Sequence, residues 1–236
     1  MNNHYTYFLV LCCSIAGPFV LSFDKKVGYY KKWKFLFPAI LFPAIFYIIW
    51  DIFFTAKNIW SFNENYITGI KLINLPIEEV LFFFVVPFCC VFVYECIRCY
   101  FPKLKSMPIG NSILQLLAVV LLVAGIIFYQ KKYTSYTFIF TAIFIAIIYQ
   151  QKKYSNRFDA TSFLVAFIII LIPFLIINGL LTAIPIVLYD NAENLDIRIY
   201  TIPFEDIFYG MLLVLMNIWI YEKLQDKKSS DVNAIR

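Results

Sequence analysis

Two pairs of adjacent acidic residues stand at equivalent points of two long apolar stretches. The pairs are Glu78-Glu79 and Glu205-Asp206. Each pair follows a proline, precedes a long uncharged run and is followed by a closing Tyr-Glu, and a constant offset of 127 residues relates the two copies. A carboxyl group at the centre of a membrane costs roughly 2.5–3.5 kcal/mol. A duplicated acidic pair in such a place therefore indicates function more than packing.

Buried carboxyl groups of this kind are suited to proton transfer. Burial away from water favours the protonated form of an acid, whereas the amino end of a helix favours the anion. Two acids in different surroundings can therefore serve as proton donor and proton acceptor. Because neighbouring residues point about 100° apart on a helix, Glu78 and Glu79 are expected to differ in role. The alternative is that proline and acids are ordinary signals for the start of a helix.

The same offset relates polar residues upstream of the two acidic pairs. Asp51 corresponds to Asn178, Phe62 to Tyr189, and Asn63 to Asp190. The chain is therefore predicted to consist of two related halves, as in many integral membrane proteins.

Composition places the chain among membrane proteins. Of its 236 residues, 62% are hydrophobic and 15% are charged, whereas soluble domains carry about 25% charged residues. The net charge of +5 is explained by lysines in loops, so no nucleic-acid partner is expected. A single histidine, His4, excludes a histidine-rich di-iron centre. No phosphate-binding glycine motif, metal site or cofactor motif is predicted.

Seven spans are expected, which makes the fold an all-α polytopic membrane protein. They are residues 5–22, 35–56, 72–94, 112–129, 133–150, 160–180 and 199–221. From Val80 to Tyr94 there are 15 uncharged residues, about 22 Å of helix, and a membrane core is about 30 Å thick. The third span therefore reaches across only if Glu78 and Glu79 lie within the membrane or at its edge.

The expected organisation is a tandem repeat of two three-helix units joined by a linker helix. The predicted parts are residues 1–97, a linker with the fourth span at 98–132, residues 133–222, and a polar cytoplasmic tail at 223–236. With three spans in each half, the second copy would be inverted in the membrane relative to the first. The unmatched fourth span reverses this inversion and makes the two copies parallel. Five of the 20 Lys and Arg residues fall on the N-terminal side and 15 on the other. This predicts a cell-membrane protein with its N-terminus outside and its C-terminus in the cytoplasm.

The acidic motifs, with the segments beside them, closely resemble the membrane-integral lycopene cyclases. The matching residues are Leu75-Pro-Ile-Glu-Glu-Val-Leu-Phe-Phe-Phe, Ile202-Pro-Phe-Glu-Asp-Ile-Phe-Tyr-Gly, Trp60-Ser-Phe-Asn63 and Asn178-Gly-Leu-Leu-Thr. The resemblance covers roughly residues 5–222 and corresponds to the form in which two small halves are fused.

The resemblance implies a lycopene beta-cyclase, which converts the linear end groups of lycopene to β-rings without net redox change. Proton transfer is assigned to Glu78 and Glu205, with Glu79 and Asp206 as partners; which acid donates stays open. The implied partners are lycopene, other apolar carotenoids and the lipid bilayer, with a homo-oligomer as a possibility. The expected cavity residues are Asp51, Trp60, Asn63, Asn178, Tyr189 and Asp190, with Phe82 and Phe83 as aromatic faces for a carbocation.

Other interpretations remain open. An aromatic belt at the membrane surface is the alternative for Trp60 and Tyr189 and the favoured interpretation for Tyr94 and Tyr221. A proton-coupled small-molecule transporter also suits intramembrane acids and is the main alternative function. A retinal protein would need a lysine in the last span, which has none. A prenyl-diphosphate transferase would need paired Asp-rich magnesium sites, and Asp190-x-x-Glu193-x-x-Asp196 is a single candidate.

Overall fold

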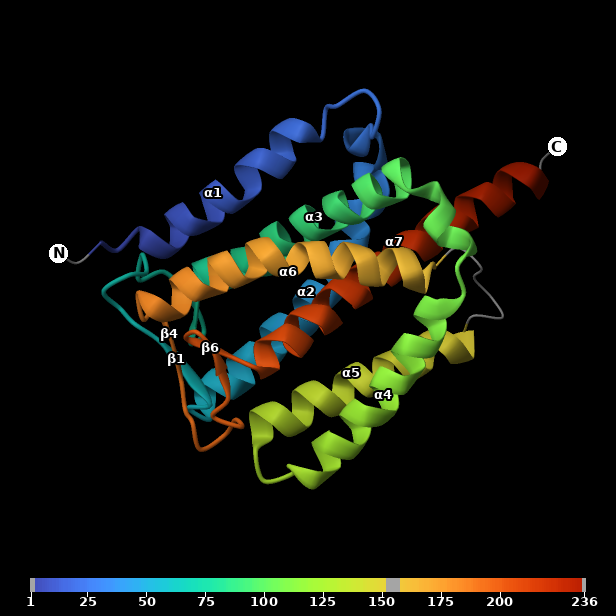
Figure 1. Ribbon diagram of the computed structural model, residues 1–236. Helices are drawn as coiled ribbons and strands as arrows, with labels where there is room; N and C mark the ends of the chain where they lie inside the picture. The colour runs from blue at the N-terminus through green and yellow to red at the C-terminus, as the bar shows by residue number, and fades with distance from the viewer. Residues whose placement is uncertain (1–2, 152–157, 235–236) are drawn as a thin grey trace.

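A bundle of long helices that share one axis direction forms the body of the protein (Figure 1). The computed structural model describes residues 3–151 and 158–234. Within those residues the helices are α1 (Thr6–Leu21), α2 (Trp33–Ala56), α3 (Ile77–Tyr100), α4 (Ile109–Ile127), α5 (Lys132–Gln151), α6 (Ala160–Ala183) and α7 (Glu205–Ala234). Residues 152–157, which hold three of the counted basic residues, and the end of the predicted tail lie outside this description.

The prediction of an all-α polytopic membrane protein is confirmed. Helices α2 to α7 are each long and apolar enough to cross a membrane. Helix α1 is apolar but has 16 residues, which is about 24 Å against a core of about 30 Å. Within residues 3–151 and 158–234, six full-length spans and one shorter apolar helix therefore stand where seven spans were expected.

Short antiparallel strand pairs precede α3 and α7. The strands are β1 (Trp60–Phe62), β2 (Lys71–Leu72), β3 (Leu75–Pro76), β4 (Val187–Tyr189), β5 (Arg198–Ile199) and β6 (Ile202–Pro203). They pair as β1 with β4, β2 with β3, and β5 with β6.

These strand pairs correct two of the predicted helix starts. Helix α3 begins at Ile77 instead of residue 72, and α7 begins at Glu205 instead of residue 199. Each hairpin turns through a residue with left-handed backbone geometry, Ile73 (φ 62°) and Tyr200 (φ 59°). Such a conformation costs an L-residue roughly 1–3 kcal/mol. Because residues such as Ile and Tyr rarely adopt it, neither residue marks its turn in the sequence.

The offset of 127 residues is obeyed by the folded elements. It maps α2 onto α6, and β1, β2 and β3 onto β4, β5 and β6, residue for residue. The ladder between β1 and β4 pairs Trp60 with Tyr189 and Phe62 with Val187, a register that is unchanged when the two halves are exchanged. Figure 1 shows α3 and α7 running in the same direction. The two copies are therefore parallel and are related by a pseudo-two-fold axis through the β1–β4 ladder. The domain boundaries drawn from the sequence stay a prediction.

Helix α4 has no counterpart and packs along the outer side of α5 (Figure 1). Close approach depends on Gly125, where an added Cβ would lie 2.7 Å from Ile139 Cγ1 and 3.2 Å from Ser135 O. The Ser135 hydroxyl donates to the Gly125 carbonyl at 2.9 Å. A small residue thus lets the linker helix lie directly against the second half.

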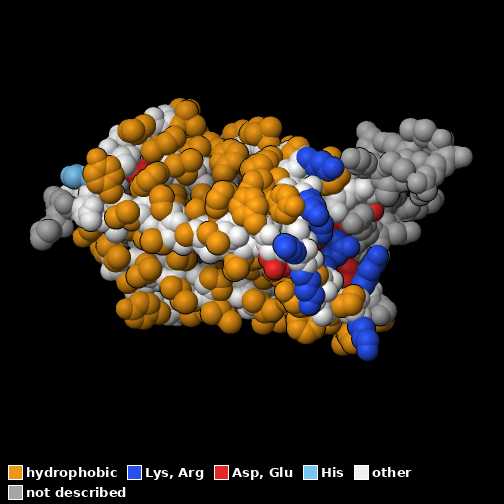
Figure 2. Space-filling view, turned by 90° about the horizontal axis from the view of Figure 1, so that it is seen from above, with side chains coloured by type: hydrophobic (Ala, Val, Ile, Leu, Met, Phe, Trp, Pro, Cys, Tyr) orange, Lys and Arg blue, Asp and Glu red, His pale blue; other side chains and the backbone are white. Residues whose placement is uncertain are grey.

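Charged side chains gather at the end of the bundle away from the strands. Figure 2 shows a band of Lys and Arg at that end and a hydrophobic surface over most of the rest. Inside the same end, Tyr221 donates to Glu95 at 2.7 Å, and Arg98 is paired with Glu222. Tyr94 and Tyr221 are fully buried, so the belt interpretation was wrong for both.

Candidate active site

A cavity of about 370 Å³ lies inside the bundle, enclosed mainly by α1, α3, α6 and α7. Its walls are mostly aliphatic and aromatic. The β1–β4 ladder contributes Trp60, Phe62, Val187 and Tyr189 to one end of it. Three carboxyl groups reach the cavity, those of Asp51, Glu79 and Asp206. Their residues are 1%, 8% and 3% exposed, so the acids face an enclosed apolar space and not bulk water.

The two carboxyl groups of the first half form a pair. Asp51, from α2, contacts Glu79, from the first turn of α3. The Tyr7 hydroxyl of α1 donates to Glu79 Oε2 at 2.5 Å. The Tyr209 hydroxyl of α7 donates to Asp51 Oδ1 at 2.5 Å. Two carboxyl groups in contact away from water repel each other when both are charged, so the arrangement is suited to holding one proton between them.

The carboxyl group of the second half is surrounded by donors instead. Tyr133, at the start of α5, donates to Asp206 Oδ1 at 2.5 Å. Tyr189 of β4 donates to Oδ2 at 2.9 Å, and the Asn178 amide approaches Oδ2 at 3.4 Å. Hydrogen bonds donated to a carboxylate stabilise its charged form.

Tyr189 and Arg198 add to this environment from outside the membrane-spanning helices. Loss of contact with water raises the pKa of the Tyr189 hydroxyl well above its usual range, and the nearby Asp206 charge raises it further. Tyr189 therefore keeps its proton and remains a donor at ordinary pH. The Arg198 guanidinium lies 5.7 Å from the centre of the Tyr189 ring, which brings a positive charge to this end of the site.

One of the differences between the halves that produce this contrast is an exchange of a carboxyl group for an amide. Asn178 is the counterpart of Asp51, and Asp206 is the counterpart of Glu79. In the second half the donor to the carboxyl group is an amide, and an amide has no ionisable proton. In the first half a carboxyl group takes the place of that amide, and it can donate only if it carries a proton. The same fold position is therefore suited to hold a removable proton in one half and holds a fixed donor in the other.

The other acid of each motif lies outside the cavity lining. Glu78 is completely buried and accepts the Thr68 backbone N–H at 2.7 Å. Glu205 accepts the equivalent N–H of Leu195 at 2.8 Å and the Thr134 hydroxyl at 2.5 Å. These two carboxyl groups fasten the loop before each helix to the first turn of that helix.

The remaining predicted residues divide into two groups. Trp60, Phe82, Asn178 and Tyr189 line the cavity. Phe83, Asn63 and Asp190 do not. Phe83 packs on Tyr47 in the core, while Asn63 Oδ1 and Asp190 Oδ1 accept backbone N–H groups two residues further on, at 3.1 and 2.9 Å.

Three tyrosines of the site were missed by sequence reasoning: Tyr7, Tyr133 and Tyr209. Tyr209 corresponds to Phe82 in the first half, so comparison of the halves shows a hydroxyl gained one turn after the acidic pair. Tyr7 and Tyr133 carry no such signal, because Tyr is common in this chain, with 17 copies. Their relevance depends on how α1 and α5 pack against α3 and α7.

These features define a class of protein: an integral membrane protein of two parallel three-helix units that enclose acids in an apolar chamber. The chain belongs to the lycopene cyclase family, whose family model matches residues 4–97 and 130–224. This confirms the family resemblance.

Individual relatives match over shorter stretches. The lycopene beta-cyclase of Halobacterium salinarum, in each of two strains, is 35% identical over 83 residues, which are 34% of this chain and 35% of the relative. A bifunctional lycopene cyclase/phytoene synthase of Phaffia rhodozyma is 34% identical over 93 residues, which are 35% of this chain and 13% of the relative. The matched stretch thus spans about a third of the Halobacterium relatives. No solved structure matches the chain.

Proposed function

We propose that this protein is a lycopene beta-cyclase that isomerises the linear end groups of lycopene to β-rings within the membrane. The observation that carries the proposal is the placement of two unlike acid sites, the Asp51–Glu79 pair and Asp206, on one apolar cavity. Membership of the lycopene cyclase family and the names of the Halobacterium relatives supply the substrate class.

The cyclisation needs an acid and a base in an apolar chamber. An acid protonates the terminal double bond of the end group, which leaves a tertiary carbocation. The next double bond attacks this cation and closes a six-membered ring, so the positive charge moves to a ring carbon. A base then removes a proton from the adjacent ring carbon, and the electron pair of that C–H bond becomes the ring double bond. One proton is added and one is lost, so the product is an isomer and no co-reactant is consumed.

We assign the acid to the Asp51–Glu79 pair and the base to Asp206. The proton held between the two carboxyl groups can pass to an apolar substrate. Its departure leaves a second negative charge on the pair, and Tyr7 and Tyr209 stabilise the two carboxylates by donation. Asp206 is suited to act as the base, because Tyr133 and Tyr189 donate to it and stabilise its charged form when it carries one. Glu78 and Glu205, which the sequence favoured for proton transfer, are reassigned to holding the loops.

The aromatic walls suit a passing carbocation. The rings of Trp60, Phe82, Tyr133 and Tyr209 line the same cavity as the acids, and the Trp60 ring centre lies 5.2 Å from that of Tyr133. The face of an aromatic ring attracts a cation by roughly 2 kcal/mol or more when water is absent. The β1–β4 ladder forms part of the wall beside the acids, which keeps out water that would otherwise trap the cation.

The test is expression in a host that accumulates lycopene, followed by chromatography of the pigments. The expected result is conversion of lycopene to a one-ring and then a two-ring product with β-rings. The same host with the Asp206→Asn variant is the control for activity of the host itself. Unchanged lycopene in a host whose membranes contain folded wild-type protein would overturn the proposal. Cysteine accessibility from each side of the membrane tests the proposed cytoplasmic C-terminus and outer N-terminus.

A further inference from the structure

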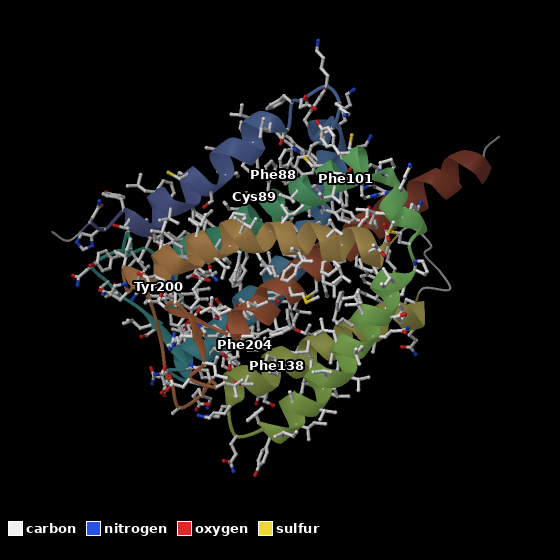
Figure 3. The ribbon with its side chains drawn as sticks, viewed as in Figure 1. Phe88, Cys89, Phe101, Phe138, Tyr200 and Phe204 are labelled. Atoms are coloured by element: carbon white, nitrogen blue, oxygen red, sulfur yellow. The ribbon has the colours of Figure 1, made fainter. Side chains whose placement is uncertain are left out.

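The cavity meets the outer surface of the bundle between α1 and α6. Of the residues that line it, Cys13 on α1 and Pro173 on α6 are exposed, whereas the others are buried or half-buried. Both helices pack on α3, whose Cys89, labelled in Figure 3, also lines the cavity. The Cys89 thiol contacts the Ser14 carbonyl of α1 at 3.5 Å. The opening is therefore a groove between α1 and α6, with α3 at its floor.

The equivalent groove of the other half, between α5 and α2, is closed by aromatic rings. The counterpart of Pro173 is Phe46 by the 127-residue offset. Tyr7 donates its backbone N–H to Tyr66 as Tyr133 does to Glu193, so α1 and α5 correspond with an offset of 126 and Phe140 is the counterpart of Ser14. The rings of Phe46 and Phe140 meet edge to face with centres 6.0 Å apart. Trp50 meets Phe140 in the same way at 5.0 Å. The obstructing ring of Phe46 is thus replaced by Pro173 in the open half, and that of Phe140 by Ser14, which lines the cavity beside Cys13.

We propose that the groove between α1 and α6 is the single lateral entrance to the site, and that it holds the protruding part of one long apolar polyene while one of its ends lies in the cavity. The identity of this polyene rests on the proposed function. The location of the entrance rests on the exposure of Cys13 and Pro173 at the cavity and on the contact between Phe46 and Phe140 that closes the other groove.

The size of the cavity requires such an arrangement. A cavity of about 370 Å³ lies near the lower end of the roughly 300–1,000 Å³ that small-molecule pockets enclose. A forty-carbon polyene exceeds the drug-sized ligands that such pockets bury, so only one end and part of the chain fit. The rest must leave between helices at a depth where its surroundings are lipid. Exposed apolar residues lie one helical turn from the opening, Leu9 on α1 and Ile169 and Ile176 on α6.

A single entrance has a consequence for the order of the reaction. One acid–base set with one groove treats one end group at a time, and the second end lies outside in the lipid. A molecule with one ring must therefore withdraw, reverse and enter again. The one-ring product is expected to appear free in the membrane before the two-ring product.

The test closes the open groove with aromatic rings. The double variant Cys13→Phe/Pro173→Phe places them at the two exposed residues of the opening. The matched control Cys12→Phe/Ile172→Phe adds the same two rings one residue away, at exposed positions that do not line the cavity. The expected result is a loss of cyclisation of at least about tenfold for the first variant and activity near that of the wild type for the control.

A second measurement separates entry from chemistry. Each pair of changes is combined with Glu79→Gln, and the proteins are purified in detergent from the lycopene-making host. Bound lycopene is then measured by its visible absorbance per mole of folded protein. The expected result is that Glu79→Gln alone and the Cys12/Ile172 combination retain lycopene, and that the Cys13/Pro173 combination retains at least about tenfold less.

The outcomes distinguish the two proposals. If the wild type forms no rings but lycopene retention is abolished by Cys13→Phe/Pro173→Phe, the proposed reaction fails and the entrance stands. If the wild type forms rings and the obstructed variant, shown to be folded by its thermal transition, is as active and retains as much lycopene as its control, the entrance is refuted. Equal losses in the obstructed and control variants also refute it.

Discussion

The adjacent glutamates Glu78 and Glu79 provide the sharpest test of the proposed chemistry, because the same substitution at each should give opposite results. Glu79→Gln keeps the size of the side chain and an oxygen that can accept from Tyr7, which donates at 2.5 Å. Its amide can donate to Asp51, so the first half would acquire the amide–carboxyl arrangement that Asn178 and Asp206 have in the second. What is lost is the shared proton.

The expected loss of rate follows from that role. Removal of a positioned general acid typically lowers the rate by about 10²–10⁴-fold, which is roughly 2.7–5.5 kcal/mol of transition-state stabilisation. Glu78→Gln leaves the bond from the Thr68 N–H, 2.7 Å long in the native protein, to be accepted by the amide oxygen. It weakens that bond by about 1 kcal/mol. Since Glu78 does not reach the cavity, the rate should fall by less than about tenfold.

The assay measures initial rates of ring formation in membranes loaded with lycopene, with each variant normalised to folded protein. Thermal unfolding in detergent checks that both variants retain the fold. A Glu79→Gln variant within tenfold of the wild type would refute the assignment of the acid. A Glu78→Gln variant that is fully folded yet a hundredfold slower would return proton transfer to Glu78, as first expected from the sequence.

Three further changes test other parts of the structure. Asp206→Asn removes the proposed base and should slow ring formation by about 10²–10⁴-fold while lycopene still binds. Pigment analysis of the purified variant measures the bound lycopene, and its absence would contradict this prediction. Tyr189→Phe removes one of the donors to Asp206, a bond to a charged group worth about 1.5–3 kcal/mol, so kcat should fall by roughly 10–100-fold; an unchanged kcat would exclude a role for the hydroxyl. Gly125→Leu forces α4 away from Ile139 and Ser135 and should cost about 1–3 kcal/mol of stability. This loss should be visible as a lower thermal transition temperature in detergent. The control Gly17→Leu, at a position with nothing within 4 Å of the added Cβ, should leave that temperature nearly unchanged.

Duplication followed by divergence accounts for the proposed division of labour. A pair of identical halves would present two identical acid sites and two identical grooves. The exchange of Asp51 for Asn178 helps to separate the acid sites, and the exchange of Phe46 for Pro173 helps to separate the grooves. A single reaction that needs one donor, one acceptor and one entrance thereby becomes possible in a structure derived from two equal parts.

Sequence alone established the class and the plan of the molecule. The hydrophobic runs have the length and composition of membrane-spanning helices, and a repeat offset can be read directly from the sequence. The two related halves, the helical fold and the family resemblance were therefore accessible, as were the two acidic pairs and the polar counterparts Asp51 and Asn178.

Tertiary structure decided which acid of each pair faces the cavity, and which hydroxyls meet it. Adjacent residues on a helix diverge by about 100°, but the rotation of α3 about its own axis is set by its packing on α1, α2, α6 and α7. That packing turned Glu79 inward and Glu78 toward the loop. It also brought Tyr7 and Tyr209 from opposite ends of the chain onto one carboxyl pair, because contacts between distant segments are fixed by the burial of whole helix faces and leave no local pattern in the sequence.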